Sequence, residues 1–139
     1  MSAATILRIA AAVAAIQGTA HAALFLRAKP RHGPAEVAVV EAMKANRFDF
    51  AGASRSYWDF YFGYGLQAAG ACLVEALLFV FLARVAAAEP PLARPIVALF
   101  VAVNIAHAIL TARYFFYLPV LFDVLVAACL GWALLAMAR

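Results

Sequence analysis

His21 and Asp123 are two side chains of this chain that could act as a general acid or base, and both stand inside or at the edge of long apolar segments. The same segments contain polar residues able to hydrogen-bond a ligand: Gln17, Tyr64, Gln67, Asn104, His107, Thr111 and Tyr114. Polar groups inside a membrane are costly, so they are the first place to look for function. We therefore take His21 and Asp123 as candidate catalytic residues and the others as candidate ligand-binding residues.

The composition places these residues in a membrane protein. Of 139 residues, 68% are hydrophobic and 13% are charged, whereas soluble domains are roughly half apolar. A net charge of +4 is typical of loops that meet anionic lipid headgroups, and it is poor support for nucleic acid as a partner. Membrane lipids are the expected solvent and partner.

Four apolar segments must position the candidate residues, at about 5–26, 56–85, 95–116 and 119–138. We expect an all-α fold, an integral membrane four-helix bundle forming a single transmembrane domain over residues 1–139. The long first loop, 27–55, should carry an amphipathic helix from Pro34 to Phe50. The apolar run from Ile9 to Leu26 is ~27 Å long as a helix, which favours a membrane span over a cleaved signal peptide.

The candidate residues come from all four segments and are predicted to lie at similar depth. Measured from the long-loop side, His21 lies ~9 Å deep, Asp123 ~6 Å and His107 ~14 Å, from the rise of a helix. On the third segment one face is polar, because the spacing is three, four and three residues between Asn104, His107, Thr111 and Tyr114. A polar pocket that opens toward the long loop would explain the pattern. Hydrogen bonds between helices are the alternative for each residue alone.

The second segment has two opposite faces. Tyr57, Tyr61 and Tyr64 share one with Glu75, and we expect this face to point inward because Glu75 needs shelter. Glu75 should pair with Arg8, and Asp59 with Arg55. The opposite face carries the glycines at 63 and 70, which could pack within the monomer or against a second copy, so a homo-oligomer is also an option.

Cys72 and Cys129 are expected to be small packed side chains, because no spacing of Cys and His indicates a metal site. We expect neither a metal nor a cofactor. Both chain ends should lie on one side of a bacterial inner membrane, and the distribution of Lys and Arg favours a cytoplasmic long loop.

The stretches 48–52 and 54–66, Phe-Asp-Phe-Ala-Gly and Ser-Arg-Ser-Tyr-Trp-Asp-Phe-Tyr-Phe-Gly-Tyr-Gly-Leu, resemble a group of small, uncharacterised bacterial four-helix membrane proteins. The layout also resembles, more distantly, the EXPERA superfamily of emopamil-binding protein and the sigma-2 receptor. That resemblance implies a four-helix bundle with a cavity for sterol-like or other lipophilic ligands, and double-bond isomerisation in some members. The superfamily's paired acids have no residue-by-residue match here, which favours binding over catalysis.

The leading hypothesis is a binder of a lipophilic small molecule or lipid, with isomerase activity as an extension. His21 or Asp123 would then transfer protons, and Tyr64 and His107 would orient the ligand. Three alternatives stay open. His21 and His107 could ligate a b-type haem for electron transfer, Arg113 and the basic first loop fit loosely with a membrane glutathione-dependent enzyme, and the chain could be a non-catalytic assembly partner.

Overall fold

The structure, a computed structural model, describes residues 1–27 and 29–138. It is mostly helical within these residues: α1 (Ala3–Leu26), α2 (Pro34–Ala45), α3 (Tyr57–Ala88), α4 (Pro90–Tyr114) and α5 (Tyr117–Ala136), with two strands, β1 (Arg47–Phe50) and β2 (Ala53–Ser56). Helices α1, α3, α4 and α5 are long and apolar enough to cross a membrane. This confirms a mostly helical chain with four candidate spans.

The first loop differs from the prediction of one helix over 34–50. Helix α2 ends at Ala45, and residues 47–56 form an antiparallel hairpin in which Arg47 pairs with Ser56 and Phe50 with Ala53. Ala51 and Gly52 turn the chain at φ 51° and φ 80°, the positive φ values that tight hairpin turns require. The expectation of an all-α fold was therefore wrong at this hairpin.

The connection between the second and third spans is shorter than the predicted turn over 86–94. Helix α3 continues to Ala88, and α4 begins at Pro90, so Glu89 alone separates them. Proline fits the first turn of a helix, where its missing N–H has no helical partner to lose. Pro95 lies inside α4, so the prediction that α4 begins there was wrong.

A reciprocal cap fixes the start of α3. The Ser56 hydroxyl accepts the Asp59 N–H at 3.2 Å, and the Asp59 carboxylate accepts the Ser56 N–H at 2.8 Å, which satisfies two donors at the helix start. Asp59 forms its ion pair with Arg47, at 3.9 Å. The predicted pairing of Asp59 with Arg55 was wrong, because the hairpin brings Arg47 beside the cap.

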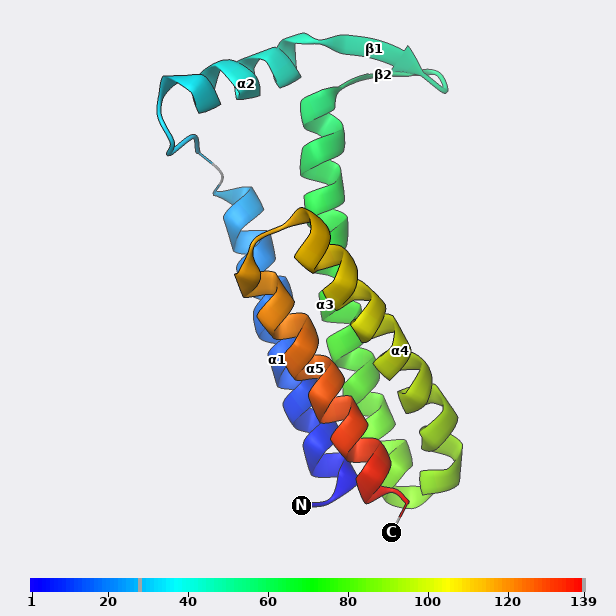
Figure 1. Ribbon diagram of the computed structural model, residues 1–139. Coiled ribbons are helices and arrows are strands. Elements are labelled where there is room, and N and C mark those ends of the chain that lie inside the picture. The colour runs from blue at the N-terminus through cyan, green and yellow to red at the C-terminus, as the bar shows by residue number, and fades with distance from the viewer. Residues whose placement is uncertain (28, 139) are drawn as a thin grey trace.

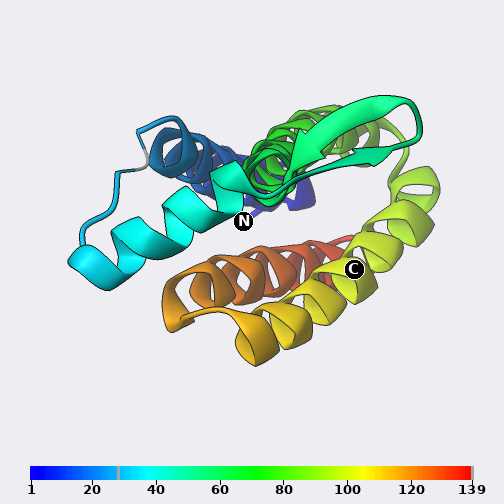
Figure 2. The same ribbon diagram turned by 90° about the horizontal axis from the view of Figure 1, so that it is seen from above.

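The spanning helices are arranged as two pairs (Figures 1 and 2). Helix α1 packs most extensively on α3, and α4 on α5; the pairs meet mainly through α1 and α5, and much less through α3 and α4. Helix α2 and the hairpin lie across one end, and both termini lie at the other. The largest fully buried side chains gather toward the terminal end: Phe79, Ile6, Leu7, Leu130, Val97 and Val126.

Gly18 lets α1 and α3 approach closely. A Cβ atom at residue 18 would stand 3.0 Å from both the Ala69 carbonyl oxygen and the Cys72 Cβ. We expect Gly18→Val to lower the free energy of unfolding by about 1–3 kcal/mol through overpacking. Gly70→Val is the control, because among the described residues no atom beyond the neighbouring residues and backbone of its own helix lies within 4 Å of its would-be Cβ. Thermal unfolding in detergent measures both, and equal stability of the two variants would contradict this packing.

Candidate functional site

Asp123 of α5 is a buried carboxyl group that joins three helices. It is 6% exposed. Its Oδ1 accepts a hydrogen bond of 2.8 Å from Gln17 Nε2 of α1, and its Oδ2 accepts one of 2.8 Å from Thr111 Oγ1 of α4. The structure thus brings together three predicted site residues, and both carboxyl oxygens of Asp123 are already engaged by protein donors.

A second polar contact joins α3 to α4. Asn104 is 2% exposed, and its Nδ2 donates to Glu75 Oε1 at 2.6 Å and to the Phe100 carbonyl oxygen at 3.0 Å. Asn104 was predicted as a site residue, whereas Glu75 was assigned to an ion pair with Arg8. That pairing was wrong: Arg8 is exposed, and among the described residues neither Arg8 nor Glu75 takes part in an ion pair.

The two contacts form one polar cluster along α4. Asn104 and Thr111 lie seven residues apart on one face of this helix, and His107 lies between them, one turn from Asn104. Within the described residues, no group of three or more His, Cys, Asp or Glu side chains could hold a metal ion. The side chains of the cluster can accept and donate hydrogen bonds between helices.

The remaining predicted site residues face outward or lie apart from the cluster. Tyr64 is 66% exposed and Tyr114 73%, and Gln67 and His107 are exposed as well. His21 is half-buried and packs against Phe25, with ring centroids 4.9 Å apart. Among the described residues, no hydrogen bond joins His21 to Asp123, the other candidate catalytic residue.

The inward face of α3 is not the tyrosine face. Tyr57 and Tyr61 are more than half exposed, so the prediction that the tyrosines line the interior was wrong. Helix α3 instead buries a row of mostly small residues: Gly65, Ala69, Ala76, Phe79, Leu82, Ala83 and Ala86. Small residues allow the backbone of a neighbouring helix to approach, and the Phe25 ring of α1 lies directly against Gly65.

Helices α3 and α4 lie close together near their connection at Glu89 and diverge toward the long loop (Figure 2). Phe79 and Phe100 meet edge to face at 5.2 Å, and one turn further along Glu75 meets Asn104. Beyond this point Ala71, Ala68 and Tyr64 continue the Glu75 face of α3 and are exposed. On α4, His107 and Tyr114 continue the Asn104 face and are exposed too. The polar cluster therefore lies where two helix faces part toward the long loop.

Two hollows lie elsewhere on the described structure. One, of about 640 Å³, adjoins the end of α1, and Ala20, Leu24 and Arg27 are among its lining residues. The other, of about 530 Å³, is an apolar groove along α4 and α5 that Ile105 and Val124 help to line. Neither hollow is lined by His21, Tyr64 or His107, which were expected to contact the ligand in a polar pocket near the long loop.

No protein-family model matches the chain, and neither a curated protein nor a solved structure matches it. The class of protein is therefore defined by its own features: four helices able to span a membrane and two buried or half-buried carboxyl groups held by neutral donors at the junction of the helix pairs.

Proposed function

We propose that this protein is an integral protein of a bacterial inner membrane that binds a lipophilic small molecule or lipid between α3 and α4. One observation carries the proposal: beyond the Glu75–Asn104 contact, toward the long loop, the facing sides of α3 and α4 are exposed. Because a carboxyl group in a membrane is costly, its presence beside exposed helix faces favours a role in recognising a ligand.

The parting faces of α3 and α4 suit an elongated apolar ligand. Ala68 and Ala71 leave room along α3, and Tyr64 and Tyr114 supply aromatic surface nearer the long loop. A polar group on the ligand would reach Glu75 and His107 at the base. This combination of apolar walls and a few converging polar groups is typical of small-molecule sites.

The cluster also limits which groups can transfer a proton to such a ligand. Asp123 accepts two hydrogen bonds from protein donors, and His21 packs against Phe25. Glu75 is half-buried and accepts one hydrogen bond among the described residues, from Asn104, and the exposed His107 lies one helical turn from Asn104 on α4. If the protein isomerises its ligand, Glu75 and His107 would therefore be the acid and base, and Asp123 would position the helices.

Native mass spectrometry with lipid extraction tests the proposal on gently purified protein. We expect a co-purifying lipophilic molecule in the wild type, and at least a tenfold loss of it in Glu75→Gln and His107→Ala, about 1.4 kcal/mol of binding. The control is Leu77→Ala, which changes a lipid-facing side chain of α3 that is 60% exposed. Folded Glu75→Gln and His107→Ala proteins with unchanged small-molecule content would refute the proposal.

A further inference from the structure

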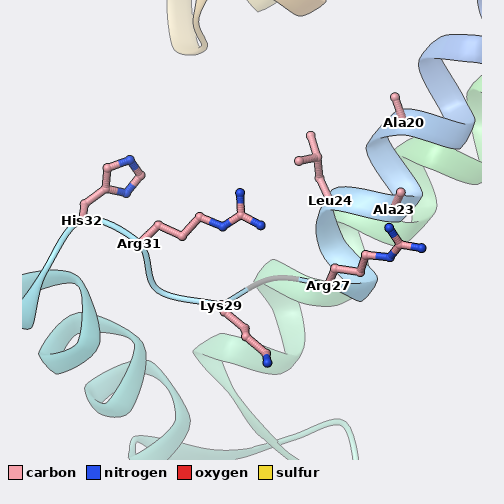
Figure 3. A pocket seen from close by; sticks show the side chains of 7 residues that line it. All are labelled: Ala20, Ala23, Leu24, Arg27, Lys29, Arg31 and His32. Carbon is pink, nitrogen blue, oxygen red and sulfur yellow. The ribbon is translucent and has the colours of Figure 1, made fainter.

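The hollow beside the end of α1 combines an apolar wall with a basic rim (Figure 3). Its volume is about 640 Å³; Ala20, Ala23 and Leu24 line its α1 side, and Arg27, Lys29 and Arg31 are among the residues of its rim. Arg31 extends across the space toward Leu24, whereas Lys29 is turned away from it. An amphiphile with an apolar tail and an anionic head is the chemical class that fits such a lining.

The hollow lies at the level expected of lipid headgroups. Leu24 and Leu26 of α1 are 59% and 68% exposed, as lipid-facing residues of a spanning helix would be. Within a few residues the exposed side chains change from apolar to basic, at Arg27, Lys29 and Arg31. Such a change at the end of a spanning helix is typical of the membrane–water boundary.

The basic side chains of the rim are not neutralised by the nearest acid. Glu36 of α2 accepts hydrogen bonds from the backbone N–H groups of His32 and Arg31, and it contacts the His32 ring at 3.2 Å. The two backbone hydrogen bonds lower the pKa of Glu36, and the one from His32 has the larger effect. The carboxylate is thus occupied in holding the turn before α2, and the ion pairs of the described residues leave out Arg27, Lys29 and Arg31.

We infer that this hollow is a binding site for the phosphate headgroup of an anionic phospholipid, with the acyl chain lying along Ala20, Ala23 and Leu24. Arg27 and Arg31, which both line the hollow, are the groups that would bind the phosphate, since guanidinium groups bind phosphate oxygens in a bidentate manner. The attraction of basic residues to anionic lipid is strongest within a Debye length of the membrane surface, which is where α1 ends. This site is separate from the α3–α4 site, and its failure would leave the proposed function untouched.

The test is the binding preference of the detergent-purified full chain for phosphatidylglycerol over phosphatidylcholine, measured by native mass spectrometry. We expect the wild type to retain phosphatidylglycerol. Changing Arg27 and Arg31 together to Gln should reduce this preference about thirtyfold, from the typical contribution of each basic residue near a membrane. The matched control changes Arg84 and Arg94 to Gln, because both are exposed near the α3–α4 connection at the other end and the lost charge is the same.

If both double variants lost the preference for phosphatidylglycerol equally, only the net charge of the protein would matter, and the proposed site would be wrong. The proposed site would also be wrong if neither variant lost the preference. The double change of Arg27 and Arg31 to Lys keeps the charge and guards against misfolding; it should retain part of the preference. Inorganic phosphate and glycerol phosphate, added in excess, should not displace the lipid. Displacement by either would assign the hollow to a soluble phosphate and overturn the lipid assignment.

Discussion

Replacing Asp123 with alanine should lower the free energy of unfolding by about 2–4 kcal/mol, because the side chains of Gln17 and Thr111 would each lose a buried acceptor. Replacing it with asparagine should cost about 1 kcal/mol or less. The asparagine carbonyl can still accept from Gln17, and its amide can donate to the Thr111 hydroxyl, which accepts as well as donates. The difference between the two variants isolates the hydrogen bonds from the shape of the side chain.

Unfolding in mixed micelles with increasing SDS, followed by circular dichroism, measures this difference. The control is Asp49→Ala, since Asp49 is an exposed acid of the hairpin, and it should change the free energy of unfolding by less than about 0.5 kcal/mol. If Asp123→Ala were as stable as Asp123→Asn, the three-helix junction would not depend on these bonds. Unchanged ligand content in a stable Asp123→Asn protein would agree with a positioning role for this carboxyl group.

The candidate membrane-spanning helices could be predicted from the sequence, because each is a long apolar run. The residues at which these helices begin and end could not be predicted in the same way. Pro90 and Pro91 were read as a turn, yet both fit the first turn of α4. The hairpin was missed for a related reason. Ala51 and Gly52 form its turn with positive φ, but Ala-Gly is not one of the pairs, such as Asn-Gly or Asp-Gly, from which such turns are predicted.

The inward face of α3 was missed because hydropathy does not measure size. The buried positions 65, 69, 76, 79, 83 and 86 fit a heptad spacing of alternating threes and fours, counting residue 72 between them, as in closely packed helix pairs. Nearly every neighbouring residue is also apolar, so hydrophobicity does not single out this stripe. The side chains on it are mostly Gly and Ala, and the tyrosines are left outside. Residue volume was the signal that could have found it.

Part of the site followed from helix periodicity, and part did not. Asn104 and Thr111 share a face of α4 as their spacing predicts, and each makes an interhelical hydrogen bond. Depth measured from helix ends was a poorer guide. It separated Gln17 from Asp123 by ~8 Å of helical rise, but their side chains are hydrogen-bonded. Helices α1 and α3 extend further toward α2 than α4 and α5 do (Figure 1), so the ends are not at one level.

A double-mutant cycle on Glu75 and Asn104 should show strong coupling. Asn104→Leu removes the partner of the Glu75 carboxyl group, and we expect it to lower the free energy of unfolding by about 2–3 kcal/mol. Glu75→Leu should cost less, about 1 kcal/mol, because the Asn104 amide keeps its bond to the Phe100 carbonyl oxygen. The double variant contains neither the Glu75 carboxyl group without its donor nor the Asn104 amide. It should therefore be about 1–2 kcal/mol more stable than the sum of the two single changes predicts.

The comparison cycle combines Glu75→Leu with Leu92→Ala, since Leu92 is 56% exposed on the first turns of α4. These changes should add within about 0.5 kcal/mol, as expected for distant sites. Additive behaviour of Glu75 with Asn104 would show that the contact contributes nothing to holding α3 against α4. The cycle can also be combined with the ligand measurement, because two leucines restore the packing of the junction but offer the ligand no polar contact. Coupling in stability, together with loss of the bound molecule from the folded double variant, would show that Glu75 both holds α3 against α4 and contacts the ligand.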